Sequence, residues 1–270
     1  MNSAQVEGAA RRAANSQTLD RLARIGLAGR GVLYGLIGFL ALQIAFGGGS
    51  GGREADKTGA VQTVAEQPFG TVLLWLMVVG FTALTLWQLS EAVMGRGRVK
   101  DRVEAGARTV VYGLIVATLL SLLLRGDAGS STDESSHDLT ARLMDLPGGP
   151  LLVGLAGLGL IALGVYWVHK GYRKRFLEDL LTGEMPPRAR RLAEKLGMAG
   201  YVARGVIAAA AGVFLVQAAI TYDPDKAKGI DSTLRALADT PAGPWLLGVV
   251  AVGLLLFAVY CFFEARWHRL

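Results

Sequence analysis

Three arginines stand at matching places inside long apolar segments of this sequence. Arg30 begins the run Arg-Gly-Val-Leu-Tyr-Gly, Arg108 the run Arg-Thr-Val-Val-Tyr-Gly, and Arg204 the run Arg-Gly-Val-Ile. A guanidinium is costly to hold in hydrocarbon, so three of them in register require a partner or a function. Glu91 and Glu264 fall near the ends of two other apolar segments, at the height where they could pair with Arg30 and Arg204.

Two interpretations of these arginines are open. In the first, each side chain extends towards the membrane surface and forms a salt bridge, which offsets the cost of burial. In the second, Arg30, Arg108 and Arg204 form a ring of cations around a shared cavity that holds an anion or a lipid headgroup. The pairing glutamates favour the first interpretation.

Acidic and polar residues recur in register as well. Glu66, Asp145 and Asp239 each stand two residues before a proline. We expect their carboxylates to accept hydrogen bonds from free N–H groups at the start of the next helix, although a cation-collecting rim is an alternative. Three polar residues, Gln43, Ser121 and Gln217, lie late in the apolar segments that contain the three arginines. Hydrogen bonds between helices account for such residues in a membrane.

Catalytic and metal-binding motifs are missing from the sequence. The single cysteine, Cys261, allows neither an intramolecular disulfide nor a cysteine metal cluster. The histidines, His137, His169 and His268, are far apart. No zinc-protease, nucleophile-elbow or P-loop motif is present, so we expect neither an enzyme nor a cofactor or metal. A lipid-handling enzyme is a weaker option, because it needs acids and a nucleophile at one interface.

The elements that must position these residues are transmembrane helices. Hydrophobic residues make up 52% of the chain and its mean hydropathy is +0.39. The apolar residues gather in six blocks of membrane-spanning length, and an isolated segment in lipid must be helical to satisfy its backbone. The predicted spans are about 25–46, 69–94, 106–124, 149–169, 198–221 and 243–263.

The charge distribution predicts how these helices are oriented. The net charge is +6, and the basic residues flank the apolar blocks instead of forming one solvated patch. Counted over alternate connections, 19 Lys and Arg lie on one side of the membrane and seven on the other. The positive-inside rule therefore places both termini in the cytoplasm. We expect anionic lipids of that surface to be partners, a protein partner to be possible, and no nucleic acid to bind.

The sequence contains an internal repeat. With the arginines aligned, each copy has an acid, a proline and a glycine in order, namely Glu66, Pro68 and Gly70, then Asp145, Pro147 and Gly149, then Asp239, Pro241 and Gly243. A further glycine follows as Gly80, Gly159 and Gly253, and an aromatic residue as Trp87, Tyr166 and Tyr260. After a tail at 1–19, the copies span 20–98, 99–190 and 191–270.

The repeat predicts an all-α polytopic membrane protein. Each copy is a helical hairpin with two spans, so the copies are parallel and related by an axis along the membrane normal. We expect six transmembrane helices arranged as three tandem hairpins with pseudo-threefold symmetry.

The arginine–glycine opening, the Pro-x-Gly turn and the threefold duplication resemble the bacterial membrane proteins grouped as domain of unknown function 1206. The resemblance covers the chain after residue 20. It implies a six-helix inner-membrane protein, fits a high-GC bacterial source such as an actinobacterium, and brings no activity or catalytic residues. The middle copy departs most, with Thr109 in place of a glycine and Lys170 where the other copies have Glu91 and Glu264.

Two functions remain open. The favoured one is a non-enzymatic membrane scaffold or accessory subunit that binds lipid or a protein partner. The alternative is a small-solute or ion transporter with a path along the repeat axis. In a transporter, the arginines and the polar residues Gln43, Ser121 and Gln217 would line one continuous wet cavity. In a scaffold, aliphatic residues would close the axis.

Overall fold

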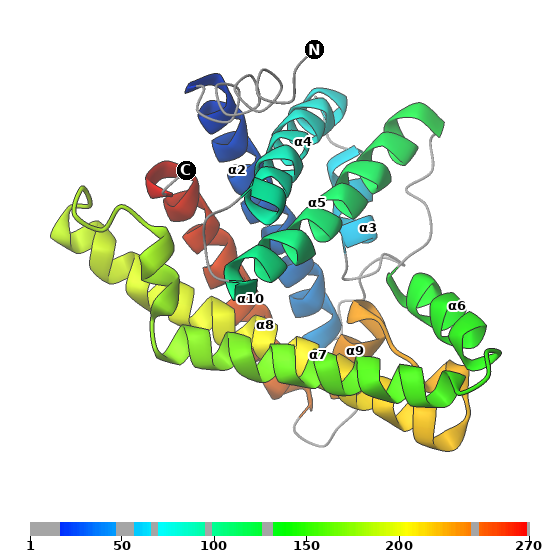
Figure 1. Cartoon of the computed structure of the whole chain (residues 1–270). Coiled ribbons are helices and arrows are strands. Elements are labelled where there is room, and N and C mark those ends of the chain that lie inside the picture. Colours follow the sequence, from blue (N-terminus) through cyan, green and yellow to red (C-terminus); the bar gives the residue numbers. More distant parts are fainter. Residues whose placement is uncertain are drawn as a thin grey trace, which may run out of the picture.

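The protein folds into six long helices and several short ones in a computed structural model, which describes residues 17–46, 57–65, 70–94, 99–125, 132–238 and 243–268 (Figure 1). The long helices are α2 (Gln17–Ala45), α4 (Gly70–Met94), α5 (Val99–Arg125), α7 (Gly149–Tyr172), α8 (Pro187–Thr221) and α10 (Gly243–Trp267). The short ones are α3 (Lys57–Ala65), α6 (Thr132–Met144), α9 (Ile230–Ala238) and the 3₁₀ turns η1 (Arg175–Asp179) and η2 (Pro224–Lys226).

All six long helices are long and apolar enough to cross a membrane. The prediction of an all-helical, multi-pass membrane protein is thus confirmed. In one place the helices differ from expectation. The span predicted at about 198–221 begins earlier, because residues 188–196 form the first turns of α8, which is a single helix of 35 residues. Its basic turns lack any glycine or proline after Pro187 that would break the helix before residue 197.

The long helices pack in a curved row in the order α5, α4, α2, α10, α8, α7. The three most extensive contacts are α7 with α8, α10 with α2, and α4 with α5. Each of them joins the first helix of one repeat to the second helix of the preceding repeat, and α10 of the last repeat packs on α2 of the first. We call these three contacts the inter-repeat interfaces.

The inter-repeat interfaces use the same alignment positions. Counted from the aligned arginines and aromatic residues, the matching positions are Gly205 and Gly164 in α7–α8, Gly31 and Ala258 in α10–α2, and Thr109 and Thr85 in α4–α5. A Cβ at Gly205 would lie 2.5 Å from the carbonyl oxygen of Gly164, and one at Gly31 would lie 3.0 Å from that of Ala258. In α4–α5, a Cβ at Gly113 would meet only Thr85 Cγ2, at 4.0 Å.

Contacts within a repeat differ among the three copies. In the first repeat, α2 and α4 meet at Gly26 and Gly80, whose backbones touch so closely that a Cβ at Gly80 would lie 2.5 Å from the Gly26 nitrogen. In the third, α8 and α10 meet where a Cβ at Gly253 would lie 2.5 Å from the Ala203 Cβ. These glycines act as small-residue contacts of the kind expected between membrane helices.

The middle repeat is open, because α5 and α7 do not pack along each other. The equivalent glycine, Gly159, would meet nothing within 4 Å if it carried a Cβ. Glu104 stands at the position of Gly26 and Gly200. A carboxylate at that position cannot be pressed against a helix backbone in lipid without a large desolvation cost. Pseudo-threefold symmetry is therefore not confirmed, although the three inter-repeat interfaces occupy equivalent places in the repeat.

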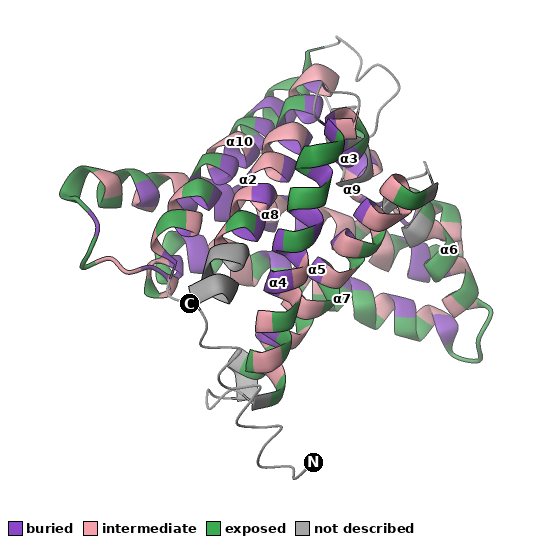
Figure 2. Cartoon of the chain, turned by 90° about the horizontal axis from the view of Figure 1, so that it is seen from above, coloured by how far each residue is buried: buried purple, intermediate pink, exposed green. Residues whose placement is uncertain are grey.

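The core lies where α2, α4, α5 and α10 come together. Figure 2 shows buried residues gathered along these helices. Its largest buried side chains on α2 and α4 are Leu27, Leu40, Leu74, Met77, Phe81 and Leu84. Among the described residues α7 contributes none to this cluster, so it is held mainly by α8.

Candidate functional site: a polar network at the basic end of the bundle

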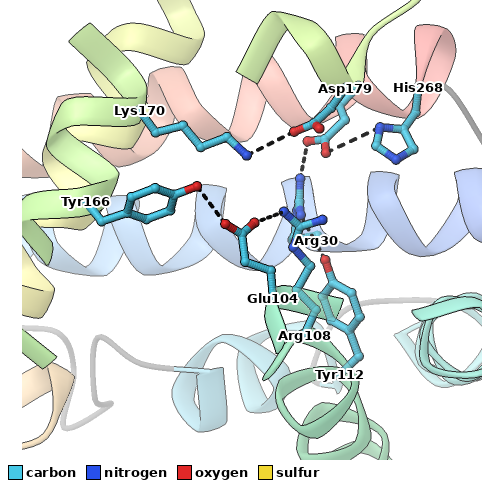
Figure 3. A network of polar contacts seen from close by, with 9 residues as sticks. Arg30, Glu104, Arg108, Tyr112, Tyr166, Lys170, Asp179 and His268 are labelled. Carbon is cyan, nitrogen blue, oxygen red and sulfur yellow. Dashed lines mark hydrogen bonds and ion pairs between the residues drawn. The ribbon is translucent and has the colours of Figure 1, made fainter. Parts of the chain in front are cut away.

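A polar network lies at the end of the bundle where α2 begins and α10 ends, which we call the basic end (Figure 3). Its centre is Arg30, whose side chain is only 12% exposed. Arg30 forms a salt bridge with Glu264, and its Nη1 donates a hydrogen bond of 2.9 Å to Tyr112 Oη. One guanidinium therefore joins all three repeats, because these residues belong to α2, α10 and α5.

Several buried polar groups surround this ion pair. His268 is buried, and its Nδ1 lies 3.7 Å from Glu264 Oε1. Burial lowers the pKa of His268, although the Glu264 carboxylate raises it, so the ring is neutral at pH 7 and leaves Glu264 to Arg30. Arg30 Nε, Tyr260 Oη and His268 Nδ1 have no hydrogen-bond partner among the described residues. Buried polar atoms of this kind are rare in folded proteins.

A second part of the network links α5 to α7. Glu104 accepts a hydrogen bond of 2.6 Å from Tyr166 Oη and forms a salt bridge of 3.2 Å with Arg108. Lys170, which is 8% exposed, pairs with Asp179 of η1 at 3.1 Å. The buried charge of this part, on Lys170, is thus compensated by an opposite charge within the protein, as burial in a medium of low dielectric requires.

Arg204 is held in a different way. Its guanidinium carbon lies 4.3 Å from the ring centroid of Trp167, 4.7 Å from that of Phe257 and 5.0 Å from that of Tyr34. The faces of aromatic rings attract cations, most strongly when both are removed from water. The aromatic rings therefore take the place of a carboxylate at Arg204.

The structure corrects the predicted partners of the arginines. Glu264 pairs with Arg30 and not with Arg204, and Glu91 is exposed, with no ion pair among the residues that the structure describes. The reason is the inter-repeat packing, which sets each arginine against the second helix of the preceding repeat. For Arg204 that helix is α7, where the matching residue is Lys170 and a salt bridge is impossible.

A family model described as Domain of Unknown Function (DUF1206) matches residues 25–95, 103–174 and 199–268. The chain belongs to this family. Each matched segment lies within one of the three predicted repeats. The chain is also 30% identical over 260 residues to the uncharacterized protein YxxB of Bacillus subtilis (strain 168), covering 93% of this chain and 92% of that protein. No solved structure matches.

The remaining predicted positions of this DUF1206 chain do not converge on one cavity. Gln43 and Ser121 are half-buried, and Gln217 is exposed. Two surface grooves, of about 550 and 490 Å³, are lined by other residues. The first lies at the basic end and is lined by Arg24, Glu184, Phe262, Ala265, Arg266 and Trp267.

Of the three acids that stand two residues before a proline, the structure describes Asp145. Glu66 and Asp239 fall outside the described residues. Asp145 is exposed, and its predicted capping role is wrong, because the residue before α7 is Gly148, at φ 77°, and no side chain caps the helix. A glycine in the left-handed region turns the chain into α7 without a side-chain acceptor.

Three members of the network were not singled out from the sequence. Glu104 carried a visible signal, since it replaces the glycine of the other two copies. Tyr112 lay within the quoted Arg-Thr-Val-Val-Tyr-Gly run. Asp179 had no signal, because its contact with Lys170 depends on how η1 folds back after α7.

Proposed function

We propose that this DUF1206 protein is a non-enzymatic scaffold or accessory subunit of the bacterial inner membrane, which binds anionic lipid. The observation that carries the proposal is the filled centre of the bundle. Leu33, Leu40, Phe81, Leu119 and Leu254 are all at most 3% exposed and belong to one apolar cluster. A transport path would have to cross this cluster, whereas a scaffold gains stability from it.

The arginines support the same proposal. Arg30 and Arg108 have protein carboxylates as partners, and Arg204 has aromatic rings. Cations that are already compensated have little left to attract a transported anion. Their arrangement is that of groups that hold helices together.

The charge bias supports an orientation with both termini in the cytoplasm. The basic end would then face the anionic leaflet surface, where each Lys or Arg adds about 1 kcal/mol of attraction. The groove of about 550 Å³ at this end carries Arg24 and Arg266, with Trp267 beside them. Arg266 also lies 5.2 Å from the Trp267 ring centroid. Arg24 Nη1 donates to the carbonyl oxygens of Ala265 and Arg266. We expect a phosphate headgroup to accept hydrogen bonds from the remaining N–H groups of Arg24 and from Arg266, and the indole suits the membrane interface.

The first test separates scaffold from transporter. The purified protein is reconstituted in vesicles of phosphatidylglycerol and phosphatidylcholine, and fluxes of protons, potassium and chloride are compared with protein-free vesicles. The scaffold proposal expects equal fluxes. A flux well above that of empty vesicles would favour the transporter if it is lost when Phe81 is replaced by Trp. The larger side chain would fill the apolar cluster further.

The second test addresses the lipid. Native mass spectrometry counts phosphatidylglycerol and phosphatidylcholine retained by the protein from mixed micelles. We expect preferential retention of phosphatidylglycerol, reduced by replacing both Arg24 and Arg266 with Gln. The control is Arg142→Gln, which changes an exposed arginine of α6 that does not line this groove. Equal retention of the two lipids would contradict the anionic-lipid site.

A further inference from the structure

The two helices of the middle repeat are the least covered of the six. Only 11% of the apolar stretch of α5 and 17% of that of α7 are buried, against 39–56% for the other four. Exposed leucines alone mean little in a membrane protein, since lipid covers them. The difference lies in which faces of α5 and α7 are left open.

The open face of α7 is built to receive a helix. Gly159 is exposed and would meet nothing within 4 Å if it carried a Cβ, and Ala156 and Ala162 beside it are exposed as well. The equivalent glycines of the other repeats are both covered by a helix, Gly80 by α2 and Gly253 by α8. Small residues at such positions let helix backbones approach closely in lipid.

The open face of α5 is the matching counterpart. In the third repeat, the residue that covers Gly253 is Ala203. Its equivalent in the middle repeat is Ala107, which is exposed, with Val110 and Val111 beside it at 63% and 53% exposure. The third repeat therefore shows that this pair of faces fits together.

Within one chain the two faces do not meet. Glu104 pairs with Arg108 on the same helix and accepts a hydrogen bond from Tyr166 of α7. This hydrogen bond ties the basic ends of α5 and α7 through side chains and not through backbone contact. Beyond this tie the helices diverge (Figure 1).

We propose that the open middle repeat binds a second copy of this chain, with α5 of each copy packed on α7 of the other and Ala107 of the second copy seated on Gly159. A two-fold axis along the membrane normal keeps both copies in the same orientation and makes the interface isologous. It covers both open faces at once, which a single foreign helix or a homotypic α7 contact does not. The proposal goes beyond the scaffold function and does not depend on the lipid groove.

Disulfide crosslinking in native membranes tests the contact. Two tagged chains, one carrying Ala107→Cys and the other Gly159→Cys, are co-expressed and oxidised. We expect a covalent dimer that contains both tags. The native Cys261 is buried, so the unmodified chain provides the background. A matched control pair uses Leu86→Cys and Val213→Cys, two positions of 56% and 55% exposure on α4 and α8, and should give no dimer.

The other outcomes overturn the proposal. A crosslink that forms only inside one chain carrying both cysteines would mean that the middle repeat closes on itself. Self-crosslinking of Gly159→Cys alone would mean a homotypic α7 contact. No crosslink, together with a monomer retaining lipid in native mass spectrometry, would mean that lipid covers these faces.

A bulky residue provides the second test. Gly159→Leu has open space in the single chain, so the fold and its thermal stability should be unchanged. Self-association, measured by fluorescence energy transfer between labelled copies in vesicles, should weaken about tenfold. Unchanged self-association in a folded variant would contradict the proposed contact at Gly159.

Discussion

The α7–α8 and α4–α5 interfaces occupy equivalent places in the repeat, yet they are packed differently. In α7–α8, Gly164 and Gly157 face Gly205 and Gly212, and the backbones lie in contact along much of both helices. In α4–α5, threonine and valine stand at these positions, and the contact is less extensive. The size of a few side chains therefore sets how closely two otherwise similar helix pairs approach.

The tight pair needs this closeness for a reason that the loose pair lacks. Of the six long helices, α7 packs extensively only on α8, whereas α4 and α5 both contribute to the main core. Because membrane helices gain no hydrophobic energy from leaving lipid, close van der Waals contact has to hold α7 in place. The third interface, α10–α2, combines intermediate glycine–alanine spacing with the buried Arg30–Glu264 ion pair.

The largest effect is expected from Glu264→Gln in the α10–α2 interface. Removing one partner leaves the buried Arg30 charge uncompensated, at a cost of about 3–5 kcal/mol in the free energy of unfolding. The measurement is unfolding by sodium dodecyl sulfate in mixed micelles. The control, Glu91→Gln, changes the aligned but exposed glutamate and should alter stability by less than about 0.5 kcal/mol. Equal losses for the two variants would contradict the assigned pairing.

Gly164→Leu should give the next largest effect and tests the comparison directly. Its Cβ would lie 2.6 Å from the Gly205 oxygen and the Ala209 nitrogen, which are backbone atoms that cannot move aside. We expect a loss of about 3 kcal/mol, at the upper end for overpacking. Thr85→Leu makes the matching change in α4–α5 and should cost less than about 1.5 kcal/mol, because the neighbouring backbone is farther away. The same unfolding assay compares them, and a larger loss for Thr85→Leu would reverse our interpretation.

Local patterns in the sequence were sufficient to predict the six spans and the repeat. Each apolar block is long enough to show its membrane-spanning character without reference to its neighbours. The recurring glycines also stand out in the sequence, and the structure places Gly31, Gly205 and Gly212 against helix backbones.

Which residues pair in the polar network depends on which helices lie side by side. Local sequence patterns do not predict these helix neighbours. Glu264 is 234 residues from Arg30, and it becomes the partner only because the last helix packs on the first. The heights of the arginines were predictable, but their neighbours were not. The opening of the middle repeat could have been suspected, since Glu104 replaces a contact glycine.

Arg204→Gln should have a smaller effect than either of these changes, and it tests what replaces the ion pair in the tight interface. The variant loses the cation that lies over Trp167, Phe257 and Tyr34, worth up to about 2 kcal/mol when desolvated. Arg204→Lys keeps the charge but not the planar group, so it should recover only part of the stability. Both are measured by detergent unfolding, followed by the fluorescence of the five tryptophans, of which Trp167 lies at the changed site. Full stability in Arg204→Gln would mean that the rings hold the helices without the cation.

The smallest effect concerns an exposed polar contact between α6 and η2, the elements that precede α7 and follow α8 in the chain. His137 of α6 lies 3.4 Å from Asp138 and 2.9 Å from Asp225 of η2, and these contacts raise its pKa. A raised pKa in the folded state means that the contact stabilises fully below the unfolded value of about 6.5 and is lost as pH rises through the folded value. Hydrogen exchange of α6 should therefore be slower at about pH 5.5 than at about pH 8, after correction for intrinsic rates. Asp225→Asn should remove much of this difference, whereas exchange in α7 and α8 should stay the same at both pH values, because their glycine contacts carry no charge.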